Sequence, residues 1–176
     1  VFTVSIFILF YLIFFVDKFG YIKNRVFSFF DPNTGTHNFQ SEKAIEAISS
    51  GGFFGKGIGE GTLKNRVPEA HTDYIVSVIS EEFGIVFIIL LLFIFLFLIY
   101  TVFKRIYLEK DEKVKLILTG LITLIISQAL IHLGVNIRLF PTTGMTLPYL
   151  SYGGSSIIGM SILSGIILNL TKRKVV

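Results

Sequence analysis

The chain has 176 residues, of which 52% are hydrophobic and 16% are charged, and its mean hydropathy is +0.74. This composition excludes an ordinary soluble domain and predicts an all-α integral membrane protein, a polytopic helical bundle surrounded by membrane lipids. The net charge of +4 comes from basic residues at the ends of apolar segments. Because no basic stripe is present, nucleic acid is not expected as a partner. The absence of cysteine excludes a disulfide framework and a thiolate metal site.

Four apolar segments are predicted to cross the membrane, at residues 1–16, 75–103, 116–137 and 157–171. The first begins inside an apolar run at Val1 rather than at Met, which predicts that the chain is the later part of a longer protein. Residues 84–103 carry no charge and are long enough to cross a hydrocarbon core of about 30 Å. The last segment is short. The Gly/Ser run before it therefore either extends the helix or forms a re-entrant loop.

Charge predicts the orientation of these segments. The connector 104–115 holds five Lys and Arg residues and the tail 172–176 holds three more, and short loops rich in these residues stay in the cytoplasm. Residues 17–74 and 138–156 are then external loops on the same side of the membrane. Residues 17–73 carry seven basic and seven acidic residues, so they show no inward bias.

The large external loop is predicted to contain a turn at residues 31–35 and a short amphipathic helix at 41–50, capped by Ser41 and lying in the membrane interface. The predicted apolar face of this helix consists of Ala44, Ile45 and Ile48.

Residues 51–61 contain six glycines. The segment is not a P-loop, because Lys56 is followed by Gly57 rather than by Ser or Thr. Two interpretations remain open. The segment is either a flexible loop or a place where the backbone and Lys56 approach a diphosphate closely.

Ionisable residues cluster in the next segment, where Glu69, His71 and Asp73 alternate directly before an apolar helix. A structural interpretation is that Thr72 or Asp73 caps this helix. The functional interpretation is that an ionisable cluster at membrane depth forms a site together with the Gly/Ser/Pro-rich loop 141–156.

A polar stripe follows one face of the third segment, because Gln128, His132 and Asn136 lie at i, i+4 and i+8. Interhelical hydrogen bonds, worth about 0.6–2 kcal/mol each in a bilayer, explain such a stripe. His132 has no companion at metal-ligand spacing, so a zinc or iron site is not expected. Ser155 and Ser156 lack a G-x-S-x-G elbow, so serine hydrolysis is not supported.

These motifs together resemble the SEDS family (shape, elongation, division and sporulation), which contains FtsW, RodA and SpoVE. The matching stretches are residues 21–32, 44–57, 68–84 and 141–156, which run through nearly the whole chain, and the block Leu-Pro-Tyr-Leu-Ser-Tyr-Gly-Gly-Ser-Ser is the most specific. Residues 57–62 and Val135-Asn136 are most similar to the FtsW branch. Thr143, however, stands where many FtsW proteins have Lys and where RodA and SpoVE often have Thr. His132 also stands where the family often has Asn. Division versus elongation therefore stays open.

The resemblance implies a GT-C-like fold of roughly ten transmembrane helices, of which this chain would supply the last four and the large external loop. Members of the family polymerise lipid II at the outer face of the bacterial cytoplasmic (inner) membrane and release undecaprenyl diphosphate. They work with a class B penicillin-binding protein, FtsI-like for the division branch, and with divisome proteins at the septum. The chain alone is expected to be inactive, because the missing helices form the other wall of the cavity.

The resemblance places the essential carboxylate on Asp73, which would act as the general base that deprotonates the attacking sugar hydroxyl. The departing diphosphate needs cationic or amide donors, and Gly153 and Gly154 would let the second loop close over the sugar. A divalent cation is compatible with this chemistry, but no ligand set is visible, and no cofactor is assigned. The predicted substrate-binding residues are Lys56, Lys64, Arg66, Glu69, His71, Arg138, Thr143, Ser151, Tyr152, Gly153, Gly154, Ser155 and Ser156.

Two other functions fit the same residues. A lipid II flippase would also need a polar cavity between helices, whereas a non-catalytic scaffold that activates a penicillin-binding protein would use Asp73 only as a helix cap. Polymerisation in detergent distinguishes the first alternative, and the effect of an Asp73 substitution on stability distinguishes the second.

Overall fold

The computed structural model describes residues 36–67 and 69–172, together with residues 20, 27 and 29. The predicted span at 1–16, the turn at 31–35 and the tail beyond Lys172 lie outside the described residues. Within them the chain forms helices and loops without a strand. The helices are α3 (Thr36–Gly51), α4 (Leu63–Arg66), α5 (Ile75–Leu108), α6 (Glu112–Asn136) and α7 (Gly154–Thr171).

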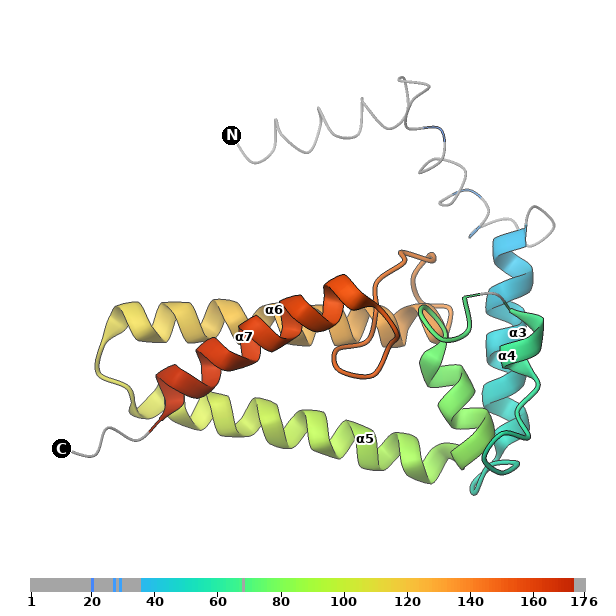
Figure 1. Ribbon diagram of the computed structural model, residues 1–176, viewed down its shortest axis with the longest axis horizontal. Coiled ribbons are helices and arrows are strands. Elements are labelled where there is room, and N and C mark those ends of the chain that lie inside the picture. The colour runs from blue at the N-terminus through green and yellow to red at the C-terminus, as the bar shows by residue number, and fades with distance from the viewer. Residues whose placement is uncertain (1–19, 21–26, 28, 30–35, 68, 173–176) are drawn as a thin grey trace.

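The helices form two groups (Figure 1). The long part of α5, together with α6 and α7, runs along the length of the molecule, and α3, α4 and the start of α5 lie across one end. The three long helices are each apolar and long enough to cross a membrane. The connector between α5 and α6 and the end of α7 lie together at the opposite end.

Helix α5 is broken at Gly84, where φ is 79° and ψ is 179°. Residues 75–83 turn away along α3, and residues 85–108 continue as the spanning part, which rises roughly 36 Å. A non-glycine residue rarely adopts this φ, and a Cβ at Gly84 would overlap the carbonyl group of Phe53. The break thus depends on glycine at this position.

The glycine-rich segment 51–61 caps both sides of this break. The amides of Lys56 and Gly57 donate to the carbonyls of Glu81 (2.9 Å) and Glu82 (3.1 Å), which end the first part of α5. On the other side, the amide of Ile85 donates to the Gly52 carbonyl at 3.0 Å. Both groups of main-chain atoms would otherwise lack helical partners. These glycines therefore permit backbone contact with α5. The Lys56 and Gly57 amides are used in these contacts with α5.

Helices α3 and α4 and the first part of α5 form what we call the outer layer. They pack around a small core. Ala44 and Ala47 of α3, Leu63 of α4 and Tyr74 before α5 are buried together. The prediction for α3 was partly wrong, because the helix begins at Thr36 rather than after Ser41, and Ser41 is buried inside it. Its buried face includes Ala44 and Ala47, whereas Ile45 is exposed. The reason is that α3 packs on α4 and α5, so small side chains face its neighbours.

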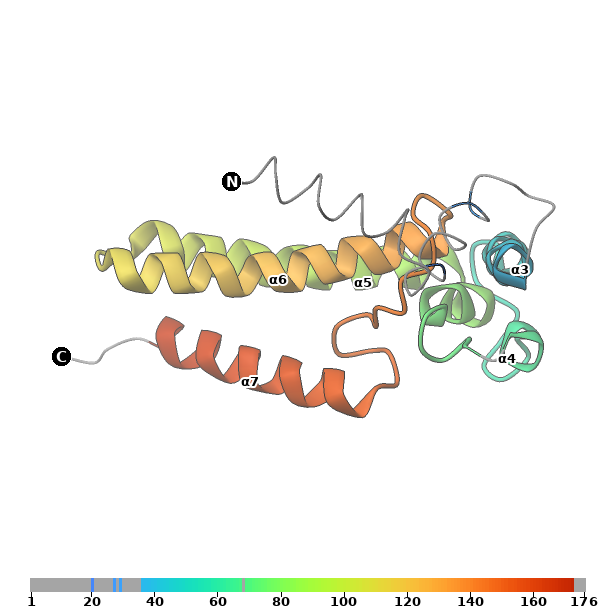
Figure 2. The same ribbon diagram turned by 90° about the horizontal axis from the view of Figure 1, so that it is seen from above.

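Helices α5 and α6 form a hairpin against which α7 packs. Asp111 caps α6 by accepting a hydrogen bond from the amide of Lys113 at 2.9 Å. Val102, Leu118, Ile122, Ile125, Met160 and Ile167 form the buried cluster that joins the three helices. In Figure 2 α5 and α6 overlap while α7 runs apart on one side. A groove of about 570 Å³ lies between α7 and the hairpin, lined by apolar side chains and by Thr101, Ser164 and Thr171.

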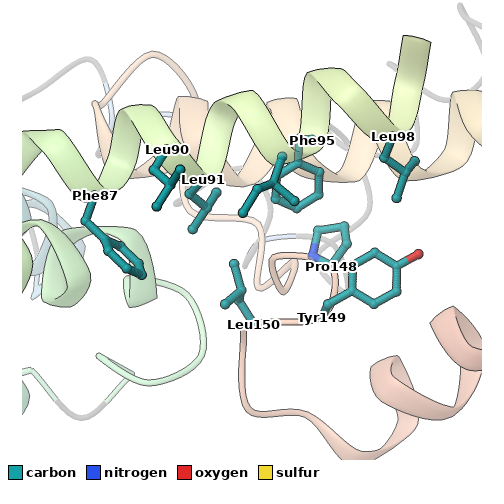
Figure 3. A pocket seen from close by; sticks show the side chains of 9 residues that line it. Phe87, Leu90, Leu91, Phe95, Leu98, Pro148, Tyr149 and Leu150 are labelled. Atoms are coloured by element: carbon teal, nitrogen blue, oxygen red, sulfur yellow. The ribbon is translucent and has the colours of Figure 1, made fainter. Parts of the chain in front are cut away.

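The loop between α6 and α7 folds back along α5, as expected for a re-entrant loop, and is called the re-entrant loop below. Leu147 and Pro148 are buried, and Pro148, Tyr149 and Leu150 line an apolar pocket of about 260 Å³ with residues of α5 as far along as Leu98 (Figure 3). The loop is held at its tip by a hydrogen bond of 2.8 Å between the Tyr149 and Ser164 hydroxyls. Helix α7 then begins at Gly154, so part of the Gly/Ser run extends the helix.

Candidate functional site

Asp73 lies at the end of a tight turn directly before α5. The carbonyl of Glu69 accepts hydrogen bonds from the amides of Thr72 (3.2 Å), Asp73 (3.0 Å) and Tyr74 (3.3 Å). The Thr72 hydroxyl also donates to a Glu69 carboxylate oxygen at 2.9 Å. The N-cap position of α5 belongs to Tyr74. Asp73 and Thr72 lie one and two positions before it.

The re-entrant loop is tied to the main-chain carbonyls of this turn. The amide of Tyr152 donates to the carbonyl of His71 at 3.1 Å, and the Ser151 hydroxyl donates to the carbonyl of Thr72 at 2.8 Å. The Ser151 hydroxyl also accepts from the amide of Leu147 at 2.8 Å. Ser151 is buried, and it thus links the two polar segments that the sequence analysis had paired.

The carboxylate of Asp73 faces Gly144. A Cβ placed on Gly144 would lie 4.0 Å from Oδ2 of Asp73, and the φ of Gly144 is 70°. The side chain of Asp73 is half-buried. The part of the second loop opposite the carboxylate is therefore the stretch around Gly144. The residues 153–156, which the sequence analysis placed there, form the entry to α7.

The polar stripe on α6 contacts both the loop after α6 and the turn before α5. The amide group of Gln128 donates to the Thr146 carbonyl at 2.9 Å, and Nδ1 of His132 lies 2.8 Å from the Met145 carbonyl. Asn136 instead contacts the first turn of α5, where it donates to the Asp73 carbonyl at 2.9 Å. The stripe was predicted to form interhelical bonds. Only Asn136 forms one, because the loop fills the space beside Gln128 and His132.

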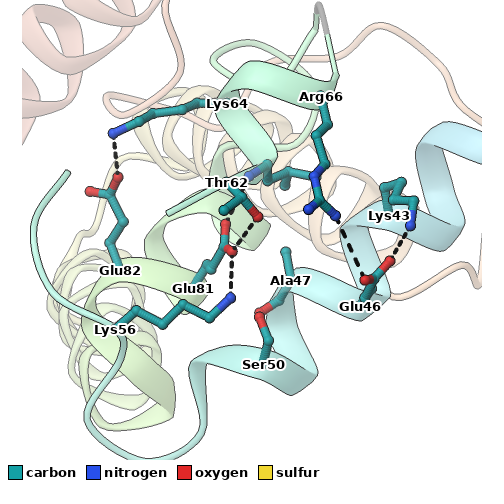
Figure 4. A network of polar contacts seen from close by, with 11 residues as sticks. Lys43, Glu46, Ala47, Ser50, Lys56, Thr62, Lys64, Arg66, Glu81 and Glu82 are labelled. Atoms are coloured by element: carbon teal, nitrogen blue, oxygen red, sulfur yellow. Dashed lines mark hydrogen bonds and ion pairs between the residues drawn. The ribbon is translucent and has the colours of Figure 1, made fainter. Parts of the chain in front are cut away.

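Several predicted cations lie elsewhere, in an ion-pair network on the outer layer (Figure 4). The carboxylate of Glu81 is 1% exposed and accepts from Nζ of Lys56 (2.8 Å), the Thr62 hydroxyl (3.1 Å) and the Leu63 amide (3.0 Å). Three donors on one buried carboxylate connect the glycine-rich segment, α4 and α5. The contacts of Lys56 therefore indicate a structural role.

The other three cations are also paired with carboxylates. Lys64 lies 3.1 Å from Glu82. Arg66 lies 3.8 Å from Glu46, and Arg138 lies 3.6 Å from Glu42. The ammonium of Lys43, which is hydrogen-bonded to Glu46, lowers the pKa of that carboxyl, and Arg66 acts in the same direction. A diphosphate would compete with these carboxylates for the cations. Arg138 directly follows the C-cap residue of α6, Ile137.

The remaining predicted residues border the turn. Glu69, His71, Thr143 and Tyr152 are exposed, and Gly153 forms the N-cap of α7 without a side-chain capping bond. Ser155 is exposed in the first turn of α7, and the hydroxyl of Ser156 accepts from Thr146 at 2.6 Å.

Gly144 and Thr146 belong to the site but were not among the residues predicted from the sequence. The available signal was the position of Gly144 between Pro141 and Pro148, where a positive φ would need glycine. No group of three or more His, Asp or Glu side chains that could share a metal ion occurs in the part of the chain described here.

Comparison with known proteins gives consistent matches. A family model described as cell cycle protein, covering FtsW, RodA and SpoVE, matches residues 1–175. Two proteins named "Probable peptidoglycan glycosyltransferase FtsW" are similar over most of the chain. That of Caulobacter vibrioides is 40% identical over 157 residues, covering 89% of this chain and 40% of its own length. That of Geobacter metallireducens is 37% identical over 169 residues, covering 93% and 44%.

One solved structure is also similar, with a TM-score of 0.62 and 27% sequence identity. It is described as "Structural coordination of polymerization and crosslinking by a peptidoglycan synthase complex". The match covers 95% of this chain and 47% of that one. The chain thus spans less than half the length of the proteins it matches, and the predicted resemblance and fold class are confirmed over that part.

Proposed function

Because the chain belongs to the cell cycle protein family of FtsW, RodA and SpoVE, we propose that it is part of a peptidoglycan glycosyltransferase. The whole protein would join lipid II units into glycan strands at the outer face of the bacterial cytoplasmic membrane, at the septum if it acts in division. Its partners would be a class B penicillin-binding protein and other divisome proteins. The relatives named as glycosyltransferases and the similarity to a peptidoglycan synthase complex support this proposal.

In this proposal Asp73 is the general base. A sugar hydroxyl attacks the anomeric carbon of a lipid-linked sugar, the bond from that carbon to the diphosphate oxygen breaks, and undecaprenyl diphosphate leaves with the electron pair. Asp73 takes the proton of the attacking hydroxyl. The single observation that carries the proposal is the placement of its half-buried carboxylate opposite Gly144, between two loops that are tied together.

The diphosphate would be bound at the start of α7 and by Arg138. The first amides of a helix have no helical partner and attract anions, and Gly153 at the N-cap leaves them without a side-chain cap. Arg138 and Arg66 would exchange their contacts with glutamates for the diphosphate. Glu69, His71, Thr143 and Tyr152 are exposed around the same turn, where they would contact the sugar.

The test is Asp73→Asn in the whole protein, purified with its penicillin-binding partner in detergent and supplied with lipid II. Removing the base should reduce glycan polymerisation by at least about 10²-fold, within the range for general base catalysis. The matched control is Glu60→Gln, which neutralises an exposed carboxylate in the glycine-rich segment and should leave the rate unchanged.

A polymerising Asp73→Asn variant would exclude the proposed base. Lipid II turnover in detergent also excludes a flippase as the explanation, because detergent has no two sides. A variant that only loses thermal stability would favour the scaffold alternative.

A further inference from the structure

Asn136 occupies the junction between α6 and the residue proposed as the base. Its side chain is fully buried, with an exposed fraction of 0%. Nδ2 donates to the carbonyls of Asp73 and His132, each at 2.9 Å. Oδ1 accepts from the amide (3.1 Å) and the hydroxyl (2.8 Å) of Ser77. The Oδ1 end of the amide group therefore has its partner on α5, and the Nδ2 end has one partner in the turn directly before α5.

The two main-chain groups that Asn136 contacts are separated by one helical turn. The carbonyl of residue 73 and the amide of residue 77 have the i, i+4 spacing of a helical hydrogen bond. The side-chain amide of Asn136 meets both of them with the donor and acceptor that a peptide group would offer. This contact fixes where the first turn of α5 lies relative to the end of α6, and it fixes the main chain of Asp73 with it.

The stretch around Gly144, which lies opposite the Asp73 carboxylate, is held by the same helix. His132 and Gln128 contact the carbonyls of Met145 and Thr146, which directly follow Gly144. One face of α6 therefore holds both segments. Asn136 contacts Asp73, and His132 and Gln128, one and two turns earlier on the helix, contact the stretch after Gly144. The distance between the Asp73 carboxylate and the stretch around Gly144 therefore depends on these three side chains of α6.

We propose that Asn136 is a positioning residue for the glycosyl transfer, which sets the place of the Asp73 carboxylate through the main chain. The inference rests on the proposed function of Asp73. A displacement of about 1 Å in a reacting group can reduce a rate by about 10²-fold. Loss of the contact should therefore lower kcat while leaving lipid II binding unaffected, because Asn136 is fully buried.

The test compares Asn136→Ala with Ser77→Ala in the whole protein with its partner. Asn136→Ala removes the contact with Asp73 and should lower kcat for lipid II polymerisation by about 10–100-fold, with KM changed less than about 2-fold. Ser77→Ala removes one hydroxyl from the same buried group but leaves the Asn136–Asp73 contact, and kcat should stay within about 2-fold of the wild type. Melting temperature is measured for both variants.

The outcomes separate positioning from a purely structural role. An Asn136→Ala protein with wild-type kcat per folded molecule would overturn the inference, as would an equal loss of kcat in Ser77→Ala. If Asn136→Ala does not fold, Asn136→Asp replaces it, since this near-isosteric variant keeps an acceptor for Ser77 and loses the donor to Asp73. Failure of both to fold would assign Asn136 to stability alone. Activity in Asp73→Asn would instead refute the proposed function, independently of these results.

Discussion

At the scale of single residues, the structure separates the ionisable groups into two sets. Asp73 lies between the two loops, whereas Glu81 lies in the core of the outer layer with Lys56 as its partner. Both carboxylates come from one short stretch of sequence. Burial and partners, rather than residue type, therefore distinguish a candidate catalytic carboxylate from a structural one.

The Lys56–Glu81 ion pair predicts asymmetric effects of its two neutralising substitutions. Lys56→Met leaves a buried carboxylate without its counter-ion and should destabilise the fold by about 3 kcal/mol. Glu81→Gln should cost less, about 1 kcal/mol, because Lys56 is 37% exposed and can be solvated by water. Thermal unfolding of the two variants in detergent checks the order. Equal effects would show that the charge of Glu81 is compensated by its other donors.

At the scale of secondary-structure elements, the break in α5 at Gly84 determines the geometry of the outer layer. The segment before the break packs on α3, and the segment after it belongs to a helix long and apolar enough to cross a membrane. The glycine-rich segment closes both helix ends at the break. The two features depend on each other, because each supplies the main-chain partners of the other.

Gly84→Ala should therefore loosen the glycine-rich segment. The new Cβ would overlap the Phe53 carbonyl group, and the backbone would be strained at φ 79°; such strain costs about 1–3 kcal/mol. Faster proteolytic cleavage within residues 53–61 and a lower melting temperature are expected. Gly120→Ala is the control, since a Cβ there meets nothing within 4 Å. Unchanged cleavage in Gly84→Ala would show that the break does not depend on glycine.

The sequence was sufficient to predict the three spanning helices and the pairing of the two polar loops, because apolar length and motif order carry that information. It could not predict the break at Gly84, since residues 85–99 are uniformly apolar and no proline lies between residues 69 and 84. The glycines of 51–61 had two interpretations, and neither included capping of a helix far along the chain. Contacts such as that of Gly55 with Glu82 exist only in the folded chain.

The pairing of the predicted cations was missed for the same reason. Lys64 and Arg138 were assigned to a diphosphate from charge alone. Their glutamate partners lie 18 and 96 positions away in sequence, at Glu82 and Glu42. Spacing within one segment does not reveal such pairs. The place of Asp73 directly before an apolar helix, by contrast, could be predicted from local pattern, whereas its role came from the family resemblance.

At the scale of the whole molecule, the polar loops and the basic connector lie at opposite ends of the α5–α6 hairpin. The charge pattern predicts that the connector is cytoplasmic, so the turn containing Asp73 should face outward. Substrate carried on a lipid would then reach it from the outer leaflet.

This orientation can be tested by labelling single cysteines. Glu60→Cys and Lys113→Cys, each made in the whole protein with any other cysteine replaced by serine, introduce exposed thiols at the two ends. A membrane-impermeant maleimide should label position 60 in intact spheroplasts and position 113 only after permeabilisation. The reverse pattern would contradict the predicted topology and the outward-facing site with it.

The re-entrant loop also constrains the order in which the protein is built during membrane insertion. Its carbonyls at Met145 and Thr146 have their partners on α6, and Ser151 needs the turn before α5. Exposed main-chain polar groups are costly among acyl chains. The loop between α6 and α7 can therefore fold only after the α5–α6 hairpin has formed. Closure of this site is then a late step of membrane insertion.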